Sequence, residues 1–294
     1  MDQFIQQFAT GLSTGSLYAI IALALVLIYR STGIVNFAQG EMAMFMTFVA
    51  WSIWNSNSNF WLAFFIALVI AGAFGALTEM TIIRPVEIGP VLNPVIVTVG
   101  LFTVLQSAAL RVWQGEPKFF PTPSVFKGAP LKLGPAAISR TNVGVFCMAI
   151  VIMLLIYFFF NYTKLGLAMR ATAQNRTAGR LVGIRTGRML ATGWALSTMV
   201  GAVAGILLAP VLFLSPSMMD GVLLFAFAAA VLGGLDSSAG AIVGGLTIGV
   251  VQNMAGTYIP NGSSIDITVA FVVIIAVLLV RPHGIFGRKV VQRV

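Results

Sequence analysis

Residues 10–29 read TGLSTGSLYAIIALALVLIY, a run of apolar and small polar residues without a single charged side chain. An apolar helix of about 20 residues spans the ~30 Å hydrocarbon core of a bilayer, so this run predicts a membrane-crossing helix. Similar runs follow along the chain, separated by polar breaks such as Asn55–Asn59. The predicted spans are 10–29, 35–54, 60–82, 92–113, 142–162, 189–212, 221–235, 239–257 and 265–280. We expect eight or nine, because 221–235 is short enough to be a broken or re-entrant element.

The composition supports the same class of protein. Of the 294 residues 59% are hydrophobic and only 9% are charged, whereas soluble domains carry about 25% charged residues. Only helices and closed barrels satisfy every backbone polar group in lipid, and these runs are continuous rather than alternating. We therefore expect an all-α, polytopic helical membrane bundle that forms a single transmembrane domain over residues 1–294.

Rare residue types exclude several classes of enzyme. The single cysteine, Cys147, rules out a disulfide framework and any multi-cysteine metal site. The single histidine, His283, rules out His-pair zinc motifs and argues against a Ser-His-Asp triad. The chain has no Gly-Lys dipeptide and hence no Walker A loop, so it cannot hydrolyse ATP itself. The sequence predicts a non-enzyme without a cofactor or a bound metal.

The basic residues predict the orientation of the chain. The net charge is +9, and the loop at about 163–188 holds six basic and no acidic residues. Lys and Arg collect in cytoplasmic loops, so we expect this loop and the C-terminal tail in the cytoplasm. Nine spans would then place the N-terminus outside. The loop has no aromatic residue, which argues against nucleic-acid binding.

Apolar residues in this loop predict a short amphipathic helix. Leu167, Ala171, Ala178, Leu181 and Val182 fall near one helical face. Such a helix suits docking into a groove of a partner protein, and it equally suits lying on anionic lipid headgroups. The residue pattern alone leaves both interpretations open.

Polar residues at membrane depth are candidates for a solute pathway, because they are costly in lipid. The run Asn36-Phe37-Ala38-Gln39-Gly40-Glu41 opens an apolar stretch and suits a broken helix start. A cap or an interhelical hydrogen-bond network is the alternative for each residue. We expect Glu79 to pair with the nearby Arg84, and Asp220 and Asp236 to be helix-end residues. The candidate pathway residues are Asn36, Gln39, Glu41, Asn93, Gln106 and Asn253.

Two glycine pairs predict closely packed helices. Gly201 and Gly205, and likewise Gly240 and Gly244, are spaced i, i+4 and so share a helix face. Small residues at such positions let helix backbones approach closely in lipid. The same faces could slide against each other during gating.

Six motifs, in order, carry a family resemblance over nearly the whole chain. The sequence resembles the membrane subunits of ABC importers of the branched-chain amino acid type, specifically the LivH-like half of the LivH/LivM family. The matching motifs are Gly15–Ala19, Asn36–Glu41, Arg84-Pro85 with Thr98–Leu101 and Gln106, Arg170–Ile184, Val231–Gly234 with Gly240–Gly245, and Pro282–Gly287.

The resemblance implies a multi-pass permease in the bacterial plasma (inner) membrane that imports branched-chain or other hydrophobic amino acids. It implies three kinds of partner besides lipid: a LivM-like second permease in a heterodimer, two cytoplasmic ATP-binding subunits and an extracytoplasmic substrate-binding protein. Urea, short-chain amides or small aromatic acids are alternative substrates, and an autonomous secondary transporter or channel is the alternative of a different class. The implied ATPase-coupling residues are Arg170, Ala171, Gln174, Asn175, Arg176, Arg180 and Gly183.

Overall fold

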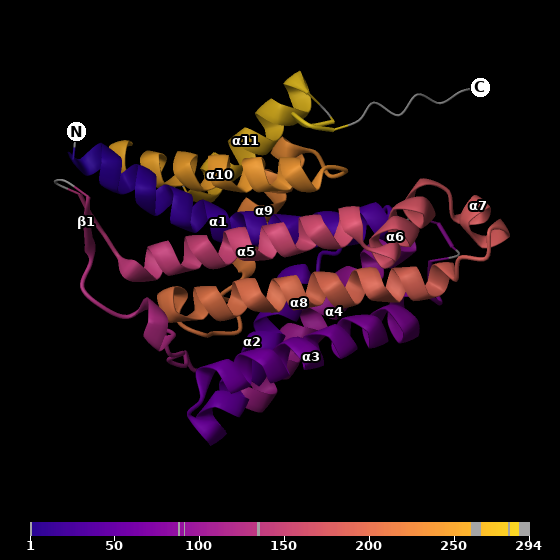
Figure 1. The fold of residues 1–294 in the computed structure, drawn as a ribbon, viewed down its shortest axis with the longest axis horizontal. Coiled ribbons are helices and arrows are strands. Elements are labelled where there is room, and N and C mark those ends of the chain that lie inside the picture. The colour runs from indigo at the N-terminus through magenta and orange to yellow at the C-terminus, as the bar shows by residue number, and fades with distance from the viewer. Residues whose placement is uncertain are drawn as a thin grey trace. The chain divides into compact units, whose positions relative to one another are not determined.

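The protein is built almost entirely from helices (Figure 1). The computed structural model describes residues 2–87, 89–90, 92–133, 136–259, 266–281 and 283–287. A π-helical turn (Glu79–Ile83) continues α3, a 3-10 turn covers Ser124–Phe126, and a short antiparallel hairpin joins β1 (Leu131–Leu133) to β2 (Ala136–Ile138). The α-helices are α1 (Asp2–Thr32), α2 (Gln39–Asn57), α3 (Phe60–Thr78), α4 (Leu92–Trp113), α5 (Arg140–Tyr162), α6 (Lys164–Gln174), α7 (Arg176–Leu181), α8 (Thr186–Leu212), α9 (Asp220–Gly233), α10 (Ser238–Tyr258) and α11 (Asp266–Val280).

Each predicted apolar run corresponds to a helix, so the helical architecture is confirmed. The predicted number of eight or nine spans is not confirmed. Within the described residues, six helices are long and apolar enough to cross a membrane. The helix α9 has 14 residues and would be about 21 Å long, less than the thickness of the hydrocarbon core. The helix α2 ends in the polar residues Asn55, Ser56 and Asn57, and it is not among the six.

The chain divides into two compact units. Unit 1 consists of Met1–Val26, Val125–Ile150 and Gly221–Val294, and unit 2 consists of Leu27–Ser124 and Val151–Asp220. The long helices α1 and α5 contribute to both units.

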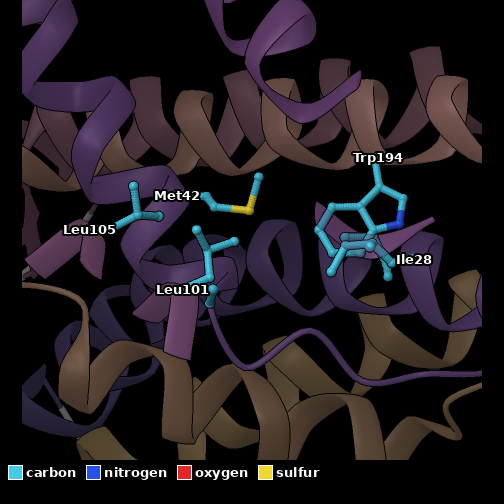
Figure 2. Packing of buried hydrophobic residues seen from close by; sticks show 7 residues of the cluster. Ile28, Met42, Leu101, Leu105 and Trp194 are labelled. Carbon is cyan, nitrogen blue, oxygen red and sulfur yellow. The ribbon is translucent and has the colours of Figure 1, made fainter. Parts of the chain in front are cut away.

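The core of unit 2 forms where α8 packs along α2 and α3 (Figure 1). Ile28, Met42, Leu101, Leu105 and Trp194 lie buried in one apolar cluster (Figure 2). Lipid tails are as apolar as these side chains, so burial from water cannot drive helices together inside a membrane. Dense van der Waals contact is therefore what holds this cluster together.

Glycines set the distance between α8 and α2 in unit 2. A Cβ atom added to Gly201 would lie 2.6 Å from Nε2 of Gln39. A Cβ atom added to Gly205 would lie 3.0 Å from the carbonyl oxygen of Ala43 and would overlap the hydroxyl of Thr47. The two helices can approach this closely because neither glycine carries a side chain.

Glycines play the same part in unit 1. Cβ atoms added to Gly240 and Gly244 would overlap the backbone of α9 at Gly233 and Ala229. A Cβ atom added to Gly245 would overlap the backbone of α1 at Ala19. The helix α10 therefore presents glycine to both of these neighbours, at separations that no larger residue would allow.

Candidate functional site

The chain turns sharply between α1 and α2, and Asn36 shapes that turn. The Oδ1 atom of Asn36 accepts a hydrogen bond of 3.0 Å from the backbone N–H of Ala38, the residue that precedes α2. Such a side-chain-to-backbone bond replaces the helical pattern locally and lets a new helix begin. The predicted irregular start is found at Asn36–Ala38, whereas Gln39, Gly40 and Glu41 already belong to the regular helix α2.

A network of buried amides joins the start of α2 to α8. Gln39 donates from Nε2 to the carbonyl oxygen of Ser197 (3.3 Å), and the hydroxyl of Ser197 donates back to Oε1 of Gln39 (3.0 Å). Asn36 donates from Nδ2 to the same Oε1 atom (3.3 Å). All three side chains are fully buried. No sequence pattern indicates Ser197, because a single serine in a long apolar helix carries no signal of its own.

Glu41 lies two residues further along α2, in a different environment. Its side chain is 0% exposed, and neither carboxylate oxygen has a hydrogen-bond partner among the described residues. Its electrostatic neighbour is the carboxyl group of Asp220, the first residue of α9. The structure thus confirms Asp220 as a helix-end residue and adds an electrostatic interaction with Glu41 that no sequence pattern indicates.

The remaining predicted pathway residues are not part of the hydrogen-bond network of Asn36, Gln39 and Ser197. Asn93 is exposed in the first turn of α4, and Gln106 is half-buried further along the same helix. Asn253 belongs to unit 1 and lies close to α1. A Cβ atom added to Gly11 of α1 would lie 3.3 Å from the Cβ atom of Asn253. In unit 2 the structure therefore gathers Asn36 and Gln39 into one network and sets Glu41 beside Asp220.

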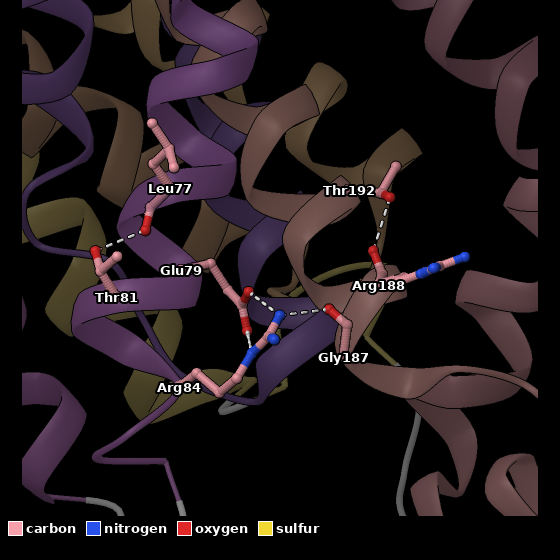
Figure 3. A network of polar contacts seen from close by, with 7 residues as sticks. All are labelled: Leu77, Glu79, Thr81, Arg84, Gly187, Arg188 and Thr192. Carbon is pink, nitrogen blue, oxygen red and sulfur yellow. Dashed lines mark hydrogen bonds and ion pairs between the residues drawn. The ribbon is translucent and has the colours of Figure 1, made fainter.

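A bidentate ion pair forms at the C-terminal end of α3, in the π-helical turn that follows it (Figure 3). Arg84 donates from Nε to Oε1 of Glu79 (3.1 Å) and from Nη2 to Oε2 (2.6 Å). In an ordinary α-helix, residues five apart point about 140° away from each other. The π-helical turn brings them together, and the backbone N–H of Arg84 bonds to the carbonyl of Glu79 in the i→i+5 pattern (2.8 Å). The predicted pairing of Glu79 with Arg84 is confirmed.

The same arginine connects this turn to α8. Its Nη2 atom also donates to the carbonyl oxygen of Gly187, in the first turn of α8 (2.9 Å). The hydrogen bonds to Glu79 raise the pKa of the Arg84 guanidinium above its ordinary value, so the cation persists at physiological pH. Arg84 therefore links the end of α3 to the start of α8 through hydrogen bonds to Glu79 and Gly187.

The basic loop forms two short helices rather than the single amphipathic helix that its residue pattern predicts. The backbone N–H of Asn175 bonds to the carbonyl of Ala171, which ends α6, and its side chain accepts from the N–H of Ala178 (2.9 Å), which starts α7. Asn175 thus caps both helices. Arg180 donates from Nε to the hydroxyl of Thr186 (3.1 Å), and the side chain of Arg176 lies outside the described part.

The tip of this segment exposes apolar side chains. Leu181 is 83% exposed and Val182 is 75% exposed, immediately after the basic residue Arg180. The adjoining Gly183 has a positive φ of 84°, which turns the chain back toward α8. This arrangement gives α7 an apolar tip flanked by positive charge, which is a surface suited to a protein partner.

The six long apolar helices of the described part indicate a multi-pass membrane protein. The family described as branched-chain amino acid transport system / permease component matches residues 7–279, and the chain belongs to this family.

Two curated relatives match almost the whole chain. The chain is 31% identical to the high-affinity branched-chain amino acid transport system permease protein BraD of Pseudomonas aeruginosa, covering 99% of this chain and 98% of the relative. It is 32% identical to the permease protein LivH of Escherichia coli, with the same coverage of both chains. Among solved structures, PsaBC from Streptococcus pneumoniae aligns at 14% identity with a TM-score of 0.49, over 93% of this chain and 91% of that one.

Proposed function

We propose that this chain is the permease subunit of an ABC importer that takes up branched-chain or other hydrophobic amino acids. The observation that carries the proposal is the end-to-end match, at 31% and 32% identity, to two permeases of branched-chain amino acid transport systems. A match over 99% of the chain includes the spans and the basic segment alike. In this proposal the host membrane is the bacterial plasma (inner) membrane.

The proposed partners supply what this chain lacks. It contains no Walker A loop, so two cytoplasmic ATP-binding subunits provide the energy. A LivM-like second permease completes the membrane portion, and an extracytoplasmic binding protein delivers the solute. We assign the contact with the ATPases to α6, α7 and the turn at Gly183, because this segment exposes Leu181 and Val182 beside basic residues. Movement of that segment would reach α3 through the bond between Arg84 and Gly187.

The proposed solute pathway in unit 2 runs past the start of α2. Asn36 and Gln39 provide uncharged amides, and Glu41 provides a buried carboxyl group. Amide groups can line a path for a zwitterion without trapping it, because they bind both charges weakly. Asn93, Gln106 and Asn253 remain predicted pathway residues.

The test is uptake by cells that lack their own branched-chain amino acid importers and carry the complete system. We expect accumulation of radiolabelled leucine, isoleucine and valine that depends on this chain. Urea, acetamide and benzoate should compete poorly, because the relatives named above are branched-chain amino acid permeases. Accumulation of one of these three compounds in place of leucine would contradict the proposed substrate. Leucine accumulation that persists without the ATP-binding subunits would contradict the proposed mechanism.

A further inference from the structure

Glu41 presents an electrostatic problem that its immediate surroundings do not solve. Its carboxyl group is fully buried, and no N–H or O–H group of the described residues donates to either oxygen. A buried carboxylate costs several kcal/mol unless a cation or a set of donors compensates it. The neighbouring amides give no help, because Gln39 bonds to Asn36 and Ser197.

The titratable group that acts on Glu41 has the same sign of charge. Asp220 contributes a second carboxyl group, which interacts electrostatically with Glu41. Two like charges at close range repel strongly in a medium of low dielectric constant. The ion pairs of the described part are Arg84 with Glu79 and Lys118 with Glu116, so neither carboxyl group of this pair has a basic side chain as its partner.

Two kinds of partner can relieve such a pair: a proton held between the two carboxyl groups, or a positively charged group from outside the described residues. A divalent metal ion would want a larger set of ligands, and the described residues hold no group of three His, Cys, Asp or Glu side chains that could bind one. A primary ammonium group has three donors, enough to reach both carboxyl groups at once. Asp220 is exposed whereas Glu41 is closed off, which gives the pair an open and a buried end.

We propose that Glu41 and Asp220 together bind the ammonium group of the transported amino acid as it passes unit 2. This inference rests on the proposed function and names the charged group of the substrate that the permease itself recognises. The exposed Asp220 receives the ammonium group first, and Glu41 completes the contact deeper in unit 2. Between substrates, a proton shared by the two carboxyl groups takes the place of the ligand.

The test uses the purified importer complex in lipid nanodiscs, without its binding protein. Two probes divide the substrate into its charged halves: 3-methylbutylamine has the ammonium group and no carboxylate, and 4-methylpentanoate has the carboxylate and no ammonium group. We expect the amine, and not the acid, to raise the thermal unfolding midpoint of the complex. Glu41→Gln and Asp220→Asn should each abolish this shift, because each removes a charged acceptor. Glu116→Gln, which neutralises an exposed carboxylate paired only with Lys118, should retain it.

Leucine uptake by the complete system is measured in parallel. Loss of one hydrogen bond between charged groups should lower uptake about tenfold or more in Glu41→Gln and in Asp220→Asn. No midpoint shift with the amine in the wild-type complex, or an equal shift in both variants, would overturn the ammonium site and leave only the shared proton. Failure of the wild-type system to import leucine would instead overturn the proposed function, even if the amine still bound.

Discussion

Replacing Arg84 with methionine should destabilise the protein measurably, because Glu79 would remain buried without its cation. The Glu79 side chain is 1% exposed and accepts two hydrogen bonds from Arg84, at 3.1 and 2.6 Å. Hydrogen bonds to charged groups contribute about 1.5–3 kcal/mol each. The Arg84 side chain is 43% exposed, so solvent screening reduces the combined effect of the two bonds to near the lower end of the range for a single such bond. We expect Arg84→Met to lower the free energy of unfolding by about 2 kcal/mol, a roughly thirtyfold change in the unfolding equilibrium.

The free energy of unfolding can be measured by steric trapping in lipid bicelles. The double variant Glu79→Gln/Arg84→Met should be more stable than Arg84→Met alone, since the unpaired charge is gone. Arg111→Met, which removes an exposed arginine that makes no ion pair in the described part, should stay within about 0.5 kcal/mol of wild type. Additive losses in the double variant, or an Arg84→Met protein as stable as wild type, would refute the argument.

Three further predictions concern packing, the amide network and the coupling segment. Gly205→Leu should force α8 away from α2 and lower the free energy of unfolding by about 2 kcal/mol or more. Gly100→Ala should be tolerated, because an added Cβ there meets no atom within 4 Å. Steric trapping measures both variants. Gln39→Ala removes the Oε1 acceptor that Asn36 and Ser197 share, so it should slow leucine uptake several-fold at unchanged expression. Normal uptake would exclude a role of this network in the pathway. Leu181→Asp should leave folding intact, because the side chain is exposed. It should reduce the stimulation of ATPase activity by loaded binding protein. Full stimulation would show that the ATPases dock elsewhere.

Sequence patterns predicted the helices well because charges and polar breaks flank each apolar run. The run 92–113 coincides with α4, and Asn59 accepts from the N–H of Leu62 to cap α3 where the polar break ends. The number of spans was harder to predict, because hydropathy does not reveal whether a short apolar helix such as α9 crosses the membrane. The small hairpin at Leu131–Ile138 was missed, since strands of three residues give too short a pattern to detect.

Local spacing also decided which contacts could be predicted. Glu79 and Arg84 are close in sequence, so their pairing was predictable, although the π-helical turn that permits it was not. The contact of Glu41 with Asp220 joins distant parts of the chain, and no periodicity in either helix indicates it. The break between α6 and α7 depends on Asn175, a strong capping residue whose effect a count of apolar positions overlooks.

The most direct test of the account is reconstitution of the importer from purified parts in liposomes. We predict uphill accumulation of radiolabelled leucine only when this chain, the second permease, both ATP-binding subunits, ATP and loaded binding protein are all present. Accumulation of leucine against its gradient by liposomes that contain this chain alone would contradict it.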